Sequence, residues 1–101
     1  MINNDTRKSY EQAIKLWTKE FQIMMLVEEF SELFKAINKR IRGKTFHQED
    51  IMEEIADVQI MLEQMIVLFN IDEVELRASY MLKLDKMKKM IESDLKTQAK
   101  S

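Results

Sequence analysis

The sequence contains no cysteine, no proline and a single glycine, Gly43. Without cysteine the chain has no disulfide and no thiolate metal ligand, which excludes a zinc ribbon and a cysteine nucleophile. Because turns favour proline and glycine and sheets need many turns, the scarcity of both residues predicts an all-α protein. The absence of disulfides is consistent with an intracellular, reducing compartment.

The charges nearly balance, with 16 Lys and Arg against 18 Asp and Glu and a net charge of −2. This balance lacks the basic excess of a nucleic-acid-binding domain, so we expect no nucleic-acid partner. No run of 18 uncharged apolar residues exists, and charges interrupt the first twenty residues, so we expect neither a membrane span nor a signal peptide. We therefore expect a cytoplasmic protein whose 101 residues form one domain.

Apolar residues at helical spacing predict two helices in the first half of the chain. Asp5 or Thr6 can cap the first helix, and a break is expected at residues 17–19. The second helix should cover residues 20–42 and stop at Gly43. Its wide apolar surface suggests burial on more than one side.

Two further helices are predicted in the second half, after a loop at residues 44–48. The third should end near Phe69 and, being the most apolar, should be central. Asp72 and Glu75 form a capping-box-like pattern that starts the fourth helix, which should run to about Asp94. Residues 95–101 are polar and are predicted to be disordered, which leaves a core of residues 5–94. Short loops between long helices favour an antiparallel four-helix bundle.

Two acidic clusters, at residues 27–33 and 52–58, stand out within apolar sequence. Each places two acids three residues apart on one helix face, Glu29 with Glu32 and Glu54 with Asp57. Like charges at this spacing oppose a helix by about 0.2–0.5 kcal/mol per pair. A hard cation with oxygen ligands would supply the counter-charge, with Mg²⁺ the first choice and Mn²⁺ an alternative. The competing interpretation is a solvated acidic helix face.

The two motifs, Glu28-Glu29-x-x-Glu32 and then Glu54-x-x-Asp57, resemble the signature of the MazG-like family of all-α nucleoside triphosphate pyrophosphohydrolases. The resemblance covers roughly residues 13–88 and is closest to small phage or Firmicutes-type members. It implies a MazG fold in which the predicted Mg²⁺ ligands are Glu29, Glu32, Glu54 and Asp57. Glu28 and Glu53 match the extra acid of each motif, and they are the predicted catalytic residues that orient water or support the ligands.

The resemblance also implies a reaction, in which a nucleoside triphosphate is cleaved to the monophosphate and pyrophosphate to cleanse a nucleotide pool. Lys83 and Lys86 match a basic phosphate-binding pattern, although Lys86 stands where arginine would give bidentate contacts. Trp17 is the candidate for stacking on the base. The alternatives are solvated lysines and a tryptophan in the core.

A homo-oligomer, either a dimer or a tetramer, is expected from the family and from the wide apolar helix faces. The rival function is a non-catalytic helical oligomerisation protein or a nucleotide-binding regulatory protein.

Overall fold

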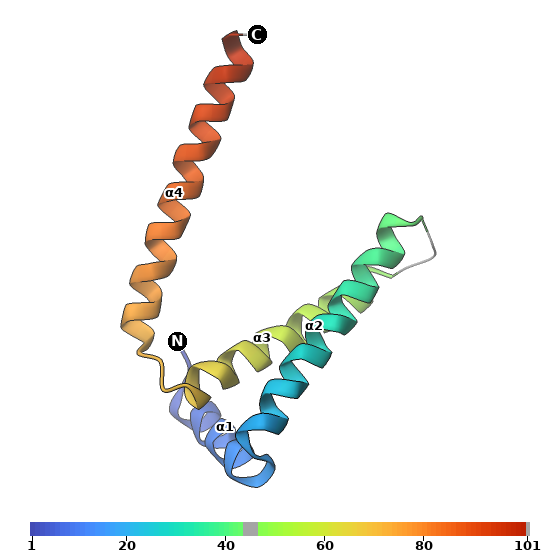
Figure 1. Cartoon of the computed structure of the whole chain (residues 1–101), viewed down its shortest axis with the longest axis vertical. Coiled ribbons are helices and arrows are strands. Elements are labelled where there is room, and N and C mark those ends of the chain that lie inside the picture. The colour runs from blue at the N-terminus through green and yellow to red at the C-terminus, as the bar shows by residue number, and fades with distance from the viewer. Residues whose placement is uncertain (44–46, 101) are drawn as a thin grey trace. The chain divides into compact units, whose positions relative to one another are not determined.

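The computed structural model describes residues 1–43 and 47–100 (Figure 1). Within these residues the chain forms helices and no strand, so the prediction of an all-α protein is confirmed. The helices are α1 (Asn4–Trp17), α2 (Lys19–Ile41), α3 (Gln48–Leu68) and α4 (Glu73–Lys100). The chain divides into two compact units, Met1–Asn70 with α1 to α3 and Ile71–Ser101 with α4.

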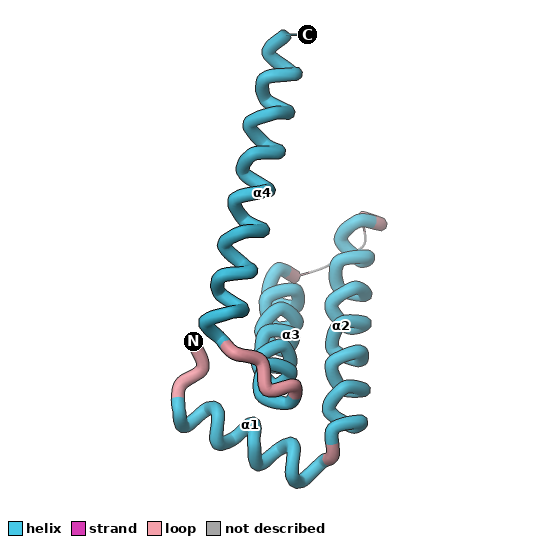
Figure 2. The backbone as a smooth tube through the Cα atoms, turned by 60° about the vertical axis from the view of Figure 1, so that its left-hand side comes forward, coloured by secondary structure: helices cyan, strands magenta, loops and turns pink. Residues whose placement is uncertain are grey.

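In the first unit, α2 and α3 run antiparallel and lie side by side, while α1 crosses one end of the pair (Figure 2). The α2–α3 contact is the most extensive, and α1 touches both helices. The loop expected at residues 44–48 lies outside the described residues at 44–46. Gly43 has φ +69° just after the end of α2, and so it ends this helix as predicted.

The core of this unit is centred on α3, as its apolar sequence predicts. Val58, Met61, Met65 and Leu68 are buried along one stripe of the helix, since intervals of three and four residues keep side chains on one face. Tyr10 of α1 packs into the same core, and its hydroxyl donates a hydrogen bond of 2.8 Å to Glu63 Oε1 on α3. Burial, then this hydrogen bond and the Glu63 charge, raises the pKa of Tyr10 to about 12.

The corner between α1 and α2 consists of one residue, Thr18, and the predicted break at residues 17–19 is confirmed. Its φ of 69° and ψ of 158° lie in a region that is essentially reserved for glycine. Its hydroxyl caps α2 by accepting from the Phe21 amide at 3.3 Å. The cap of α1 is Asn3, whose side chain accepts from the Thr6 amide at 2.8 Å, so the prediction of Asp5 or Thr6 as cap is wrong. Asn3, Asp5 and Thr6 are all residue types that can cap a helix, and only the backbone geometry selects one.

The second unit is a single long helix. Asp72 Oδ1 accepts from the amides of Val74 and Glu75 at 2.8 and 3.1 Å, which confirms Asp72 as the predicted N-cap. The helix continues to Lys100, so residues 95–100, which we expected to be disordered, are helical. Neither glycine nor proline interrupts this stretch, and a polar composition does not by itself oppose a helix. No residue of α4 is buried, and its place in a four-helix bundle stays a prediction.

Candidate metal centre

The antiparallel pairing of α2 and α3 brings the two acidic motifs together. Glu29 from α2 and Glu54 and Asp57 from α3 each offer a carboxylate oxygen, and the three oxygens lie within 4.8 Å of one another. Glu54 and Asp57 are three residues apart on α3 and share a face. This cluster, Glu29, Glu54 and Asp57, is called the acid triad below. It contains three of the four ligands that the sequence predicts.

The acid triad is electrostatically strained. Burial raises the pKa of Glu29 above its ordinary value, and the charges of Asp57 and Glu54 raise it further. Burial also raises the pKa of Glu54, followed by the charges of Asp57 and Glu32. Glu54 Oε2 is buried and has no hydrogen-bond partner within the described part of the chain. These carboxylates repel one another, and a hard cation with oxygen ligands would relieve both the repulsion and the unsatisfied oxygen.

Glu32, the fourth predicted ligand, lies at the edge of this centre. Its charge contributes to the raised pKa of Glu54, but its oxygen is not among the three that converge. Instead, Glu32 Oε1 accepts from Lys35 Nζ at 3.3 Å. Both side chains are largely exposed, so breaking this pair for another ligand would cost at most about 1 kcal/mol.

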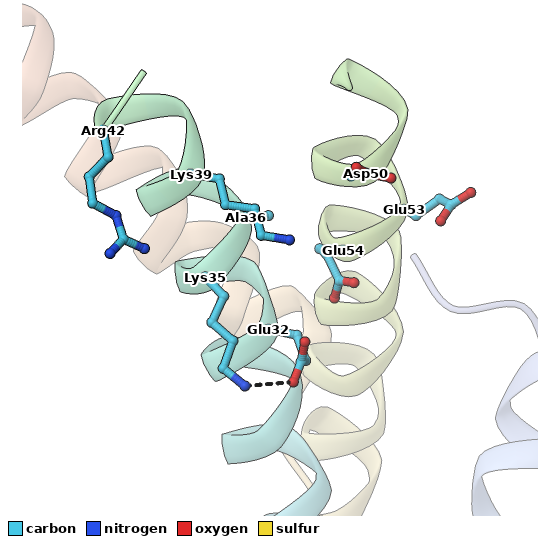
Figure 3. A pocket seen from close by; sticks show the side chains of 8 residues that line it. All are labelled: Glu32, Lys35, Ala36, Lys39, Arg42, Asp50, Glu53 and Glu54. Atoms are coloured by element: carbon cyan, nitrogen blue, oxygen red, sulfur yellow. Dashed lines mark hydrogen bonds and ion pairs between the residues drawn. The ribbon is translucent and has the colours of Figure 1, made fainter. Parts of the chain in front are cut away.

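The two predicted catalytic acids, Glu28 and Glu53, border different pockets. Glu53 lines a pocket between α2 and α3, and in Figure 3 its carboxylate points away from α2. Glu28 borders a different, mostly apolar pocket of about 460 Å³ on α2. The remaining lining residues of this apolar pocket are Phe21, Ile23, Met24, Met25 and Val27.

The pocket between α2 and α3 that Glu53 lines is called the polar pocket below. It adjoins the acid triad and has a volume of about 480 Å³ (Figure 3). Its walls differ in charge, because α2 with its C-cap supplies three cations and α3 supplies acids only. The lining residues are Glu32, Lys35, Ala36 and Lys39 of α2, its C-cap residue Arg42, and Asp50, Glu53 and Glu54 of α3. Glu54 belongs both to this pocket and to the acid triad. The three cations were not predicted as site residues, although the spacing of four and three residues between them was a usable signal.

The residues predicted to bind substrate belong to the corner between α1 and α2 and to α4. Trp17 is 47% exposed at the corner between α1 and α2, so it is not a core residue of its unit. Its ring packs on Phe21, with centroids 6.3 Å apart and planes tilted by 56°. Lys83 and Lys86 are exposed on α4, in the other unit, and their approach to the acids stays a prediction.

No protein-family model matches the chain, and no similar protein was found among curated proteins or solved structures. The function is therefore inferred from the local geometry of residues 1–43 and 47–70. Over the described residues, no helix is both long enough and apolar enough to cross a membrane.

Proposed function

We propose that the chain is a nucleoside triphosphate pyrophosphohydrolase of the MazG-like type, which uses Mg²⁺ to cleave between the α- and β-phosphates. The observation that carries this proposal is the convergence of Glu29, Glu54 and Asp57 from two separate motifs within 4.8 Å. Mg²⁺ prefers carboxylate oxygens, keeps several waters and completes its shell with substrate phosphates. Mn²⁺ is an alternative ion of similar ligand preference. A bound ion would neutralise phosphate charge and make a water molecule more acidic.

The chain's own residues would act around that ion. Glu29, Glu54 and Asp57 would hold it, and Glu32 would join them after leaving Lys35. Glu53 borders the polar pocket, and after its carboxylate turns toward α2 it would accept a proton from the attacking water. Glu28, which precedes Glu29 and borders the apolar pocket, would support Glu29 as a ligand.

The same proposal includes a homo-oligomer, as a dimer or tetramer, with the helices forming a MazG-type bundle. Its support is the apolar surface that α2 and α3 leave exposed. Side chains more than half exposed there are Met24, Val27, Phe34, Ile41 and Met52. Unless such a surface is covered, it favours association. Sedimentation should therefore show a dimer or a larger species at micromolar concentration, and a clean monomer near 12.1 kDa would contradict it.

The direct test of catalysis is product analysis across ribo- and deoxynucleoside triphosphates, with Mg²⁺ and with EDTA. We expect a monophosphate and pyrophosphate from at least one substrate, with Mg²⁺ only. Orthophosphate and a diphosphate as products would contradict the proposed bond cleavage. If Mg²⁺ and nucleotide bind without turnover, the chain is a nucleotide-binding regulatory protein, and if neither binds, an oligomerisation protein is favoured.

A thermal melt of Asp57→Asn separates a metal centre from a structural acid cluster by the sign of the stability change. Removing one repelling charge at nearly constant shape should leave the metal-free variant at least as stable as the wild type, while turnover collapses. Mg²⁺ should stabilise the wild type by about 2.7 kcal/mol at a hundredfold excess over its Kd, because it binds only the folded state, and the variant much less. Glu11→Gln, an exposed acid on α1, is the matched control. Equal destabilisation of Asp57→Asn in EDTA and in Mg²⁺ would make Asp57 a scaffold residue.

A further inference from the structure

Three cations form one wall of the polar pocket. Lys35 and Lys39 are four residues apart on one face of α2, and Arg42, which caps the C-terminal end of the helix, lines the same pocket. The opposite wall is α3, with Asp50, Glu53 and Glu54. Figure 3 shows Lys39 extending from α2 toward α3, while on α2 the Glu32 carboxylate lies beside Lys35 and on α3 the Glu53 carboxylate points away from α2.

The cations of this wall form few ion pairs and hydrogen bonds with other described residues. Lys35 is paired with Glu32 on its own helix. Arg42 Nε donates to the Asn38 carbonyl at 3.4 Å, and among residues 1–43 and 47–100 no ion pair involves its two terminal nitrogens. In Figure 3, Lys39 extends from α2 toward α3, yet it forms no ion pair with any residue in the described ranges. No salt bridge between described residues therefore closes the pocket from wall to wall.

A ligand that fits both walls must itself carry both signs of charge. A polyphosphate with a divalent cation meets this requirement, since the ion lies against carboxylates and the free phosphate oxygens lie against cations. Arginine can hold a phosphate through two parallel N–H···O bonds, and lysine acts as a mobile point charge. The volume of about 480 Å³ leaves room between the walls for phosphate groups.

The order of the two pockets and the acid triad along α2 determines which way such a ligand would be oriented. The apolar pocket around Phe21 and Met25 is followed along the helix by Glu29 of the acid triad, and then by Lys39 and Arg42 at the C-terminal end. If the bond between the α- and β-phosphates lies at Glu29 and Glu54, the β- and γ-phosphates would extend toward Arg42. The nucleoside would then lie toward the apolar pocket.

We propose that Lys39 and Arg42 bind the β- and γ-phosphates, the part of the substrate that leaves as pyrophosphate, and that recognition is directed at the polyphosphate rather than the base. This inference rests on the function proposed above. It assigns the phosphate contacts to α2, within the same unit as the acid triad, and not to Lys83 and Lys86 of α4.

The test uses inorganic tripolyphosphate, which has no base or sugar. Calorimetric titration with tripolyphosphate in Mg²⁺ is compared for the wild type, Lys39→Gln, Arg42→Gln and Lys83→Gln. Lys15→Gln, an exposed lysine on α1, is the matched control. We expect Lys39→Gln to weaken binding about tenfold and Arg42→Gln by tenfold or more, because each removes a charge-assisted contact, while Lys15→Gln and Lys83→Gln bind as the wild type. Titration of each variant with Mg²⁺ alone should be unchanged, and a circular dichroism melt checks folding.

Tripolyphosphate binding by Lys39→Gln and Arg42→Gln that equals the control would overturn the inference, as would a loss in Lys83→Gln alone. If the wild type binds no tripolyphosphate in Mg²⁺, the inference is also wrong. The wild type's own turnover then decides the other question: continued release of pyrophosphate from a nucleoside triphosphate keeps the proposed function. Failure of both turnover and Mg²⁺ binding removes the proposed function as well.

Discussion

The backbone at Thr18 supports a stability prediction whose sign is unusual, namely that glycine should stabilise the corner between α1 and α2. With φ 69° and ψ 158°, a β-branched residue occupies a conformation that costs about 1–3 kcal/mol. Thr18→Gly removes this strain. It also loses the hydroxyl cap on Phe21, which glycine replaces at a cost of a few tenths of a kcal/mol. Glycine also gives the unfolded chain more conformational freedom, which lowers the stability of the folded state by a further ~0.4–1 kcal/mol.

The net expectation for Thr18→Gly is a gain of about 1 kcal/mol, or about 4–8 °C in Tm for a domain of this size. Thr18→Ala is the matched control, since it keeps the unfavourable φ and loses the hydroxyl cap, and it should cost about 0.5–2 kcal/mol. Urea unfolding of the three proteins in EDTA measures the order directly. If Thr18→Ala is more stable than Thr18→Gly, the backbone at this corner has negative φ and the reasoning is wrong.

Two further predictions concern polar groups inside the first unit. Because the folded-state pKa values of Glu29 and Glu54 lie above the ordinary 4.5, the folded state binds more protons than the unfolded state, and the contribution of these groups to metal-free stability should fall as pH rises above about 4.5. Melts in EDTA from pH 4.5 to 7.5 should show this fall diminished in Glu29→Gln, and an unchanged profile would refute it. Gln22 is 1% exposed and both its amide atoms lack a partner among the described residues. Gln22→Leu should therefore stabilise by about 1–3 kcal/mol in urea unfolding, relative to the exposed control Gln12→Leu, and a loss of stability would show that the amide is satisfied.

Local features of the fold were predictable from the sequence because they depend on neighbouring residues. Residues only a few positions apart determine the helix period, the Asp72 cap, the Gly43 stop and the break near Thr18. The end of α4 was predicted wrongly, because a polar stretch without glycine or proline can extend a helix as easily as it can fray. What covers the exposed apolar residues of α4 depends on contacts that a single-chain pattern does not specify.

The candidate site was predictable only where helix geometry decides it. Two antiparallel helices had to bring the acidic motifs together, and Glu29 meets Glu54 and Asp57 accordingly. Residues three apart share a helix face, as Glu54 and Asp57 do, so spacing alone placed Glu32 in the site as well, whereas its carboxylate pairs with Lys35. The cations of the polar pocket were not predicted as site residues, because Lys39 and Arg42 lie near the C-terminus of α2, where cations are also favoured by the helix dipole.

The position of the acids within the unit gives the proposed ion a second consequence, for folding. The α2–α3 contact is the main packed interface of residues 1–70, and its buried apolar stripe is short. The acid triad spans this same interface, so its repulsion acts directly against the pairing of the two helices. An ion that joins carboxylates of α2 to carboxylates of α3 would replace that repulsion by a link between the helices. Metal affinity and helix pairing would then be coupled, and a substitution that weakens the α2–α3 contact far from the acids should lower the apparent affinity for Mg²⁺ as well as the Tm.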